Sequence, residues 1–343
     1  MSAVFKDSRW VMEDPCSRAT AVPPQVAPVS ALDNPVAHRR RKSGPSRQGA
    51  GLPGWFLIAA GACLVCLNAE LRGESPVETI ALPPFRMNGV PARAHIQGLE
   101  IVGNRYFVTA RRDDVTPRRA LLLLWSPEEP HWSSWDLTPP GSVTLDHPGG
   151  MQADGGRLWI PFSESRRTRK SIVRAYPIQG WTPDRVPAPE IEFPVNDHIG
   201  AVAVLSGRSL LVGASWDTEA VYLWDFSGAE REVLRGEALS RLGLGPGTPE
   251  TPGLRVQDWK GTGGGLVASG LVPTRGAFSS SVSRLLRLGD SLSSPPVLLP
   301  IPTVAGVELA QEAMAVHDGS IFFLPEDLGE TNRLIRIPLP KLP

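Results

Sequence analysis

The sequence predicts an all-β protein whose residues 75–343 form a five-bladed β-propeller. Three observations predict this fold. Five segments align with one another without gaps, each contains a tight-turn signal between two strands, and a strand-like stretch ahead of the first segment supplies the one strand that the last segment lacks. Repeats of about 50 residues are typical of propeller blades. Six blades is the alternative, but the sequence holds no sixth repeat.

The five repeats begin 52, 51, 57 and 55 residues apart, at His95, His147, His198, Arg255 and Ala310. In each, a first strand passes through a turn into a second strand. The turns contain residues that adopt the positive φ of two-residue hairpins, at Gly103-Asn104, Asp154-Gly155, Ser206-Gly207, Gly263-Gly264 and Asp318-Gly319. A β-sandwich has no reason to repeat this order at such even spacing.

Each repeat continues into a third strand, and all but the last into a fourth. The third strands are expected at Ala120–Trp125, Ile172–Ile178, Ala220–Phe226, Ser283–Leu288 and Arg333–Pro338. The fourth strands are expected at Trp132–Thr138, Glu190–Val195, Arg231–Glu237 and Pro296–Thr303. The chain ends before the fifth repeat has a fourth strand, so we expect Val77–Leu82 to pair there and close the ring, which removes an exposed sheet edge.

Charge and cysteine content exclude several classes of protein. Of 35 basic and 35 acidic residues, eight basic and four acidic ones precede residue 70, which leaves the remainder with a net charge of −4. This part of the chain lacks the clustered Lys and Arg that neutralise phosphates, so nucleic acid is not an expected partner. The three cysteines are Cys16, Cys63 and Cys66, which excludes disulfides and cysteine-based zinc sites from the propeller.

The N-terminal segment predicts export. Residues 1–50 are rich in Pro, Ser, Ala and Arg and are expected to be disordered, and the first ~35 are consistent with a wrongly assigned start codon. A basic cluster, His38–Lys42, precedes the apolar run Trp55–Leu67, and residues 51–69 are interpreted as a signal peptide with a cleavage site at Leu67-Asn68-Ala69. An uncleaved inner-membrane anchor is the alternative. Either way we expect a periplasmic or secreted propeller. We expect it to be a monomer.

Ligands of propellers bind at the axial channel, which the first strand of every blade lines. The first position of the repeat holds His95, His147, His198, Arg255 and Ala310. The third position, on the same strand face, holds Gln97, Gly149, Gly200, Gln257 and Glu312. Together with Asp258, the polar side chains of this set are candidate ligand-binding residues.

Three histidines at one repeat position suggest a metal site. Converging imidazoles with a vacant fourth position are the ligand set of catalytic zinc, so His95, His147 and His198 are a candidate site for a zinc-like divalent transition metal. Glu312 is then the candidate catalytic base. The alternative is that each histidine fills a polar slot at the start of a strand and bonds to neighbouring backbone.

A second ring of candidate ligand-binding residues follows the second strands. It contains Glu164, Trp216, Asp217, Glu326 and Asp327. Carboxylates are the ligands that calcium prefers, although acidic residues at strand ends are commonly solvated loop residues. Six tryptophans are expected to pack between blades, namely Trp125, Trp132, Trp135, Trp159, Trp216 and Trp224. As an alternative, Trp216 beside Asp217 has the chemistry to stack on a sugar or aromatic ligand. The sequence contains no Gly-x-Ser-x-Gly elbow, Walker loop, HExxH or dinucleotide fingerprint.

Several strings resemble a family of uncharacterised secreted bacterial propellers that is defined only as a domain of unknown function. They are His147-Pro-Gly-Gly-Met-Gln, Leu158-Trp-Ile-Pro161, Gln257-Asp258 and Phe323-Leu-Pro-Glu-Asp327. The architecture is more loosely similar to gluconolactonase, paraoxonase and strictosidine-synthase propellers, which implies six blades and axial calcium. This sequence departs from them in blade count, and His and Arg stand where calcium requires acidic and amide oxygens.

These observations predict an exported propeller that binds a small molecule at its axial channel. A metal-dependent hydrolase or lyase, of the lactone or ester class, that uses the three histidines is the first alternative. A scaffold that presents its loops to another envelope protein is the second. Membrane contact is expected only through residues 51–69.

Overall fold

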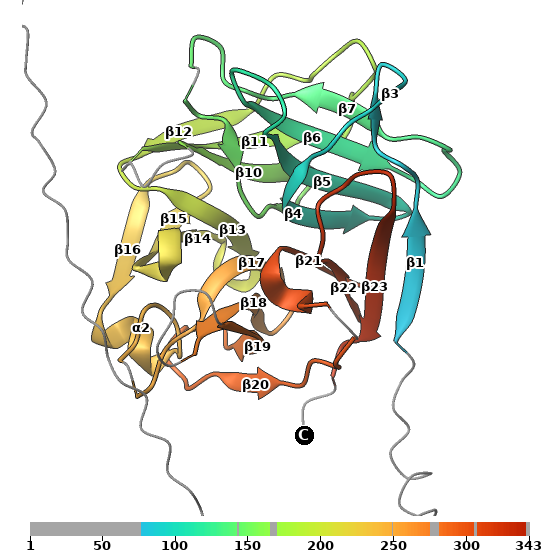
Figure 1. Ribbon diagram of the computed structural model, residues 1–343. Coiled ribbons are helices and arrows are strands. Elements are labelled where there is room, and N and C mark those ends of the chain that lie inside the picture. Colours follow the sequence, from blue (N-terminus) through green and yellow to red (C-terminus); the bar gives the residue numbers. More distant parts are fainter. Residues whose placement is uncertain are drawn as a thin grey trace, which may run out of the picture. The chain divides into compact units, whose positions relative to one another are not determined.

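Five antiparallel sheets surround a common axis in the computed structural model, which describes residues 77–142, 144–164, 170–248, 250–274, 281–304 and 307–340 (Figure 1). The innermost strand of each sheet contacts the innermost strands of the two flanking sheets, from β4 through β9, β13, β17 and β21 back to β4. The ring therefore closes after five blades, as the repeats predict, and the six-bladed alternative is wrong.

The strands follow the expected order in every blade. Blade 1 contains β4 (His95–Val102), β5 (Arg105–Arg112), β6 (Arg119–Trp125) and β7 (Ser133–Asp136). Blade 2 contains β8 (His147–Pro148), β9 (Gln152–Asp154), β10 (Arg157–Ser163), β11 (Ser171–Pro177) and β12 (Ile191–Val195). Blade 3 contains β13 (Ile199–Leu205), β14 (Leu210–Ser215), β15 (Ala220–Asp225) and β16 (Glu230–Arg235). Blade 4 contains β17 (Arg255–Thr262), β18 (Gly265–Pro273), β19 (Ser281–Leu288) and β20 (Val297–Leu299).

Blade 5 joins the two ends of the propeller. Its order is β21 (Ala313–His317), β22 (Ser320–Leu324), β23 (Asn332–Pro338) and β1 (Glu78–Leu82), and Figure 1 shows β1 lying beside β23. The β1–β23 pair is antiparallel, and the Arg336 guanidinium lies 3.2 Å from the Glu78 carboxylate across it. The predicted closure by an N-terminal strand is confirmed. A short hairpin of β2 (Arg86–Met87) and β3 (Val90–Pro91) follows β1.

Some local details differ from the prediction. The blade 2 turn lies one residue later than expected, at Gly155-Gly156, where both residues have positive φ. The blade 3 turn is a 3-10 segment, η1 (Ser206–Arg208), that ends on Ser209 at φ 52°. The fourth strand of blade 3 stops at Arg235, because Gly236 turns the chain into the short helix α2 (Glu237–Arg241). Local turn chemistry therefore decided boundaries that the strand pattern alone left open.

The hydrophobic core is divided into five layers, one between each pair of neighbouring blades. Each layer combines the face of one sheet with the opposite face of the next, so the strands carry apolar residues on both faces. The predicted packing of tryptophans between blades is confirmed for Trp125, Trp132, Trp135, Trp159 and Trp224, all less than 10% exposed. Burial of one such side chain contributes roughly 1.5–3 kcal/mol.

Candidate functional site

A cavity of about 210 Å³ lies at one end of the propeller axis, and all five blades contribute to its lining. Its floor and walls come from the starts of the innermost strands and from the segment that follows β14. The lining polar side chains are His95, Gln97, His147, His198, Ser215, Trp216, Asp217, Gln257 and Glu312. We call this cavity the axial pocket. Of the first and third repeat positions, the lining contains His95, His147, His198, Gln97, Gly200, Gln257 and Glu312, but not Arg255, Ala310 or Gly149.

β-Bulges aim the third repeat position into the axial pocket. The pairing of the innermost strands shifts between Ile96 and Gly98 in blade 1, between Ile199 and Ala201 in blade 3 and between Val256 and Asp258 in blade 4. The unpaired residue is Gln97, Gly200 or Gln257, and each of these lines the pocket. A bulge releases one residue from the ladder and re-aims its side chain. In blade 5, Glu312 lies just before β21 and occupies the same place.

A chain of hydrogen bonds fixes one wall of the pocket. The Arg111 guanidinium is paired with Asp113 and donates from Nη1 to His147 Nδ1 at 2.9 Å. Because arginine only donates, His147 Nδ1 is unprotonated and its proton lies on Nε2. That Nε2–H donates to Gln97 Oε1 at 2.7 Å. The Gln97 amide NH₂ is therefore the end of this side chain left for the pocket.

The structure does not support the three-histidine metal site. Burial, and then the positive charge of Arg111, hold the pKa of His147 well below its ordinary value, and both of its ring nitrogens already have protein partners. The His198 ring packs edge-on against Trp216, with centroids 4.5 Å apart, and against His147. Within the residues that the structure describes, no three His, Cys, Asp or Glu side chains are grouped to hold a metal ion. The alternative, in which each histidine bonds to neighbouring backbone, also differs from the structure for His147, whose partners are the side chains of Arg111 and Gln97.

His95 differs from the other two histidines. Its Nδ1 lies 2.8 Å from Asp327 Oδ1, on the loop between β22 and β23, and its side chain is 31% exposed. The hydrogen bond to Asp327 raises the pKa of His95, against burial, and the charges of Glu312 and Asp327 add to it while Arg111 opposes it. Burial raises the pKa of Asp327, but the His95 hydrogen bond and charge outweigh it and leave that pKa below its ordinary value. The pair is thus a hydrogen-bonded imidazole and carboxylate.

Glu312 is the unpaired acid of the axial pocket. Within the described parts of the chain it makes neither a hydrogen bond nor an ion pair. Burial raises its pKa to about 7; the positive charges of His95 and Arg111 lower it, and Asp327 raises it further. A carboxyl group with a perturbed pKa in a concave site is typical of functional residues.

Trp216 and Asp217 form the wall opposite Gln97. They belong to the 3-10 turn η2 (Trp216–Thr218), in which Asp217 has φ 54° and Thr218 φ 56°. Aspartate tolerates this left-handed conformation better than most residues. The Thr218 hydroxyl accepts from the Val256 backbone, and Asp217 lies 3.5 Å from the Arg255 guanidinium. Arg255 therefore serves the pocket by holding Asp217 and is not among its lining residues.

Asp258 is not a ligand-binding residue, which corrects the prediction. It is fully buried one residue beyond the pocket, where its carboxylate accepts from the backbone of Leu99, Trp259 and Met314 and from Lys260 Nζ at 2.5 Å. Burial raises the pKa of Asp258 to about 6, against the Lys260 charge, so it is ionised at neutral pH. The sequence could not exclude Asp258, because the groups that occupy its carboxylate include backbone amides of blades 1 and 5.

Lys260 fills the axis below the axial pocket together with Asp258. Its Nζ also donates to the Met151 carbonyl at 2.8 Å, which links blade 4 to blade 2. Blades 2 and 3 bond directly through Gly150, whose backbone pairs with Gly200 and Val202. A Cβ at Gly150 would lie 2.5 Å from Asp258 Oδ1, so only glycine fits there. The axis is therefore filled by an ion pair and close backbone contacts below the axial pocket.

Two further predicted ligand-binding residues lie outside the axial pocket. Glu164 accepts a hydrogen bond from the Thr144 hydroxyl, and Glu326 forms a two-bonded ion pair with Arg333. Neither is among the residues that line the pocket. Both agree with the alternative of solvated loop acids, and Asp327 reaches the site only through His95.

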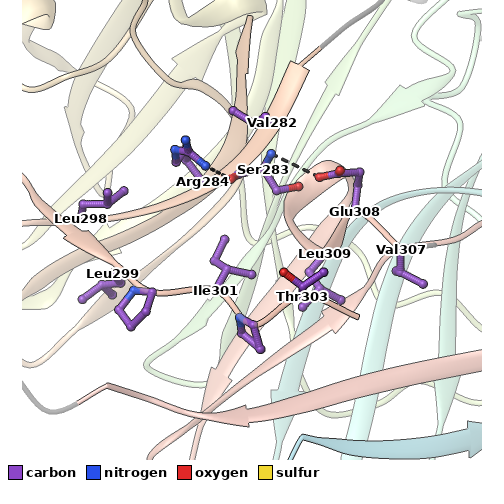
Figure 2. Close-up of a pocket in the computed structure, with 12 residues that line it drawn as sticks. Val282, Ser283, Arg284, Leu298, Leu299, Ile301, Thr303, Val307, Glu308 and Leu309 are labelled. Atoms are coloured by element: carbon purple, nitrogen blue, oxygen red, sulfur yellow. Dashed lines mark hydrogen bonds between the residues drawn. The ribbon is translucent and has the colours of Figure 1, made fainter. Parts of the chain in front are cut away.

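In two larger cavities the acidic side chains that contribute to the lining already have protein partners. One of about 470 Å³ lies on the outside of blade 4 and is lined largely by apolar side chains such as Leu298, Ile301 and Val307. Figure 2 shows that its acid, Glu308, is bonded to the backbone of Ser283, and Arg284 also bonds backbone there. Another, of about 490 Å³, adjoins Asp327 and the loop that precedes β23. We therefore take the axial pocket as the candidate site.

Residues 137–244 match the model of a family of unknown function (DUF6454). The match spans blades 2 and 3 and includes the string that begins at His147, which agrees with the resemblance noted for that part of the sequence. The looser similarity to gluconolactonase-type propellers is not supported by these comparisons. No curated protein matches the sequence.

Solved structures resemble the fold at low identity. An engineered GH43 glycoside hydrolase with endo-xylanase and exo-arabinofuranosidase activity aligns over 75% of this chain and 51% of its own, at 12% identity and a TM-score of 0.48. The GH43 endo-arabinanase of Bacillus licheniformis aligns over 74% and 96%, at 12% identity and 0.43. A luciferin-regenerating enzyme aligns over 74% and 79%, at 12% identity and 0.42. This chain spans about half the length of the first of these, and none of them bears on its activity.

The predictions about export fall on residues 1–76, which lie outside the described residues. Where the structure does describe the chain, none of its helices has the length and apolar character needed to cross a membrane.

Proposed function

We propose that this propeller binds a small polar molecule in the axial pocket. The observation that carries the proposal is the convergence of polar side chains from all five blades on one concave site above a closed axis. Ligand sites are typically concave and hold a few well-placed polar groups, and sites for drug-sized molecules occupy about 300–1,000 Å³. At about 210 Å³, the axial pocket suits a smaller ligand.

The charges of the pocket limit the kind of ligand. Asp217 is balanced by Arg255, and Asp327 by His95, so the uncompensated group is Glu312. The Gln97 amide supplies a donor, and Glu312 supplies an acceptor or, when protonated, a donor. A small molecule with carbonyl or hydroxyl oxygens satisfies both groups. We favour this ligand class over a metal ion, because His147 has no free nitrogen.

A pocket-filling variant tests the proposal. Gly200 lines the pocket, its backbone lies outside the left-handed region, and an added Cβ meets only the Ala214 carbonyl at 3.9 Å, so Gly200→Gln fits and occupies the cavity. Saturation-transfer NMR with a set of small sugars, hydroxy acids and keto acids is expected to give ligands that bind the wild type and lose at least about tenfold in affinity, ~1.4 kcal/mol, in this variant.

The matched control is Gly263→Gln. Gly263 lies in the β17–β18 turn, at the far end of the blade, and an added Cβ there has open space. This variant is expected to bind as the wild type does. If no member of the set distinguishes Gly200→Gln from Gly263→Gln, the axial pocket is not the binding site.

We further propose that the propeller acts outside the cytoplasm. The support is the apolar run Trp55–Leu67 behind the basic cluster His38–Lys42. Cell fractionation with N-terminal sequencing of the exported form tests it, and recovery of the full-length chain from the cytoplasm would contradict it.

A further inference from the structure

Two titratable side chains of the axial pocket are not used by the hydrogen bonds that shape it. His147 has both nitrogens engaged, and Asp217 is held by Arg255. His95 is engaged only through Nδ1, and Glu312 has no partner within the described chain. These two side chains come from blades 1 and 5, which are neighbours in the ring.

Asp327 determines which nitrogen of His95 is available. An ionised carboxylate only accepts hydrogen bonds, so the 2.8 Å contact places a proton on His95 Nδ1. Neutral His95 therefore keeps a lone pair on Nε2, the form in which imidazole accepts a proton. Asp327 also accepts from the Ile96 backbone at 3.4 Å, which fixes it against the same strand. It is a positioning residue for His95.

Glu312 has the chemistry of a proton donor, whereas His95 has that of an acceptor. Its carboxyl group is enclosed in the pocket, and its pKa of about 7 means that a large fraction is protonated near neutral pH. A protonated carboxyl group donates a proton, and general acids are most effective when their pKa lies near the working pH. The charged groups that act on both side chains are the same, namely Arg111, Asp327 and each other.

The Gln97 amide is the third element. The Arg111–His147 chain leaves its NH₂ group toward the pocket, so it presents a neutral donor in a fixed direction. A preorganised donor of this kind stabilises negative charge that develops on an oxygen atom during a reaction.

We propose that the axial pocket is a proton-transfer site, in which His95 Nε2 accepts a proton from the bound molecule, Glu312 returns one to it, and the Gln97 amide holds the oxygen between them. This proposal rests on the proposed function, because it requires a molecule in the pocket. One proton leaves the ligand for His95 and one reaches it from Glu312, so atoms and charge balance, and solvent restores both residues afterwards. The ligand class is a small carbonyl or hydroxyl compound whose reaction needs no electron transfer.

Nitrogen-15 NMR of the imidazole rings in the full-length protein tests the proposal without a ligand. We expect His95 to carry its proton on Nδ1 when neutral, and to titrate above the ordinary histidine value. Asp327→Asn is expected to lower this pKa by about one pH unit and Glu312→Gln by on the order of half a unit, because each removes a nearby negative charge. Glu326→Gln is the control, since Glu326 pairs with Arg333, and it should change nothing.

Carbethoxylation by diethyl pyrocarbonate gives an independent readout, because this small reagent attacks unprotonated imidazole nitrogen. At pH 7.5, mass spectrometry is expected to find His95 modified roughly tenfold faster than His147, whose nitrogens are both hydrogen-bonded. Gly200→Gln should slow the modification of His95 by narrowing the pocket.

Two results would overturn the proton-transfer role. One is a neutral His95 that carries its proton on Nε2, and the other is a His95 pKa that is the same in the wild type and in Glu312→Gln. Either result, with a successful binding screen, removes the catalytic role and leaves the proposed function intact. A failed screen removes the proposed function, whatever His95 does in the titration.

Discussion

The axial pocket and the level of the axis directly beneath it are both built around the innermost strands of the blades. They differ in whether protein groups satisfy the polar side chains. In the pocket, His95 and Glu312 keep atoms that have no partner within the part of the chain that the structure describes. One residue further along, Asp258 accepts from three backbone amides and from Lys260, and both members of the ion pair are almost completely buried. The same channel therefore holds one level with unsatisfied polar atoms, which is the reactive level of our proposal, and one structural level.

The difference shows that polarity alone does not mark a functional residue at a propeller axis. The decisive quantity is whether the protein itself satisfies the group. At the third repeat position, bulges turn side chains into the axial pocket. At the fourth, Asp258 accepts from backbone amides of three blades. Four substitutions test whether the two levels differ in this way.

The largest effect is expected from Asp258→Ala at the structural level. It leaves the Lys260 ammonium buried without its partner and three backbone amides of the axis without their acceptor. Removal of one member of a buried ion pair costs about 3–5 kcal/mol. Urea unfolding measures the loss. Glu326→Ala, which breaks an exposed ion pair, is the control and should cost at most about 1 kcal/mol; equal losses would contradict the comparison.

The second effect concerns Glu100, which lies two residues beyond the bulge of β4. It is 7% exposed, its Oε2 has no hydrogen-bond partner, and burial raises its pKa to about 8, with Lys260 opposing. The ordinary value of 4.5 applies to the unfolded chain, so between these pH values the folded protein holds a proton that the unfolded chain has lost. Stability should therefore fall as pH rises through this window.

Glu100→Gln should remove this pH dependence. We expect the variant to be more stable than the wild type at pH 8 by roughly 1–3 kcal/mol, since a buried charge no longer forms. Thermal unfolding from pH 5 to 9 checks it, with the exposed Glu129→Gln as control. Parallel curves for the wild type and Glu100→Gln would show that Glu100 is not buried as a neutral acid.

A third change tests the wall of the pocket. Arg111→Met removes the donor that holds His147 Nδ1 and the positive charge beside it, so the pKa of His147 should rise and its preference for the Nε2–H form should weaken. Loss of one charged hydrogen bond costs about 1.5–3 kcal/mol at most. Imidazole nitrogen-15 spectra report the change, and an unaltered His147 would contradict the hydrogen-bond chain from Arg111 to Gln97.

The smallest effect is expected from Glu312→Gln at the reactive level. Because no group in the described chain binds Glu312, its loss should change stability at pH 4, where the acid is protonated in both the folded and the unfolded chain, by less than about 0.5 kcal/mol. The wild type should lose stability from pH 4.5 to about 7, where only the folded protein keeps this proton, and the variant should not. Thermal unfolding across this range decides it. A large loss of stability in the variant at pH 4 would place Glu312 in the structural level.

The sequence determined the blade count, the strand order and the closure of the ring, because these follow from repeat spacing and from the one strand missing at the C-terminal end. It also placed Gln97, Gln257 and Glu312 at the axis, since equivalent repeat positions occupy equivalent places around it. Repeat spacing can be read from the sequence alone, without knowledge of which segments contact one another in the fold.

Only the tertiary structure separated the three histidines and removed Asp258 from the site. His95, His147 and His198 are alike in the repeat, but their partners differ, since Asp327 bonds to His95 and Arg111 bonds to His147. The carboxylate of Asp258 is occupied by Lys260 and by backbone amides of neighbouring blades, which the sequence does not show. Which polar groups remain unsatisfied depends on contacts between blades, and those contacts decide where chemistry is available.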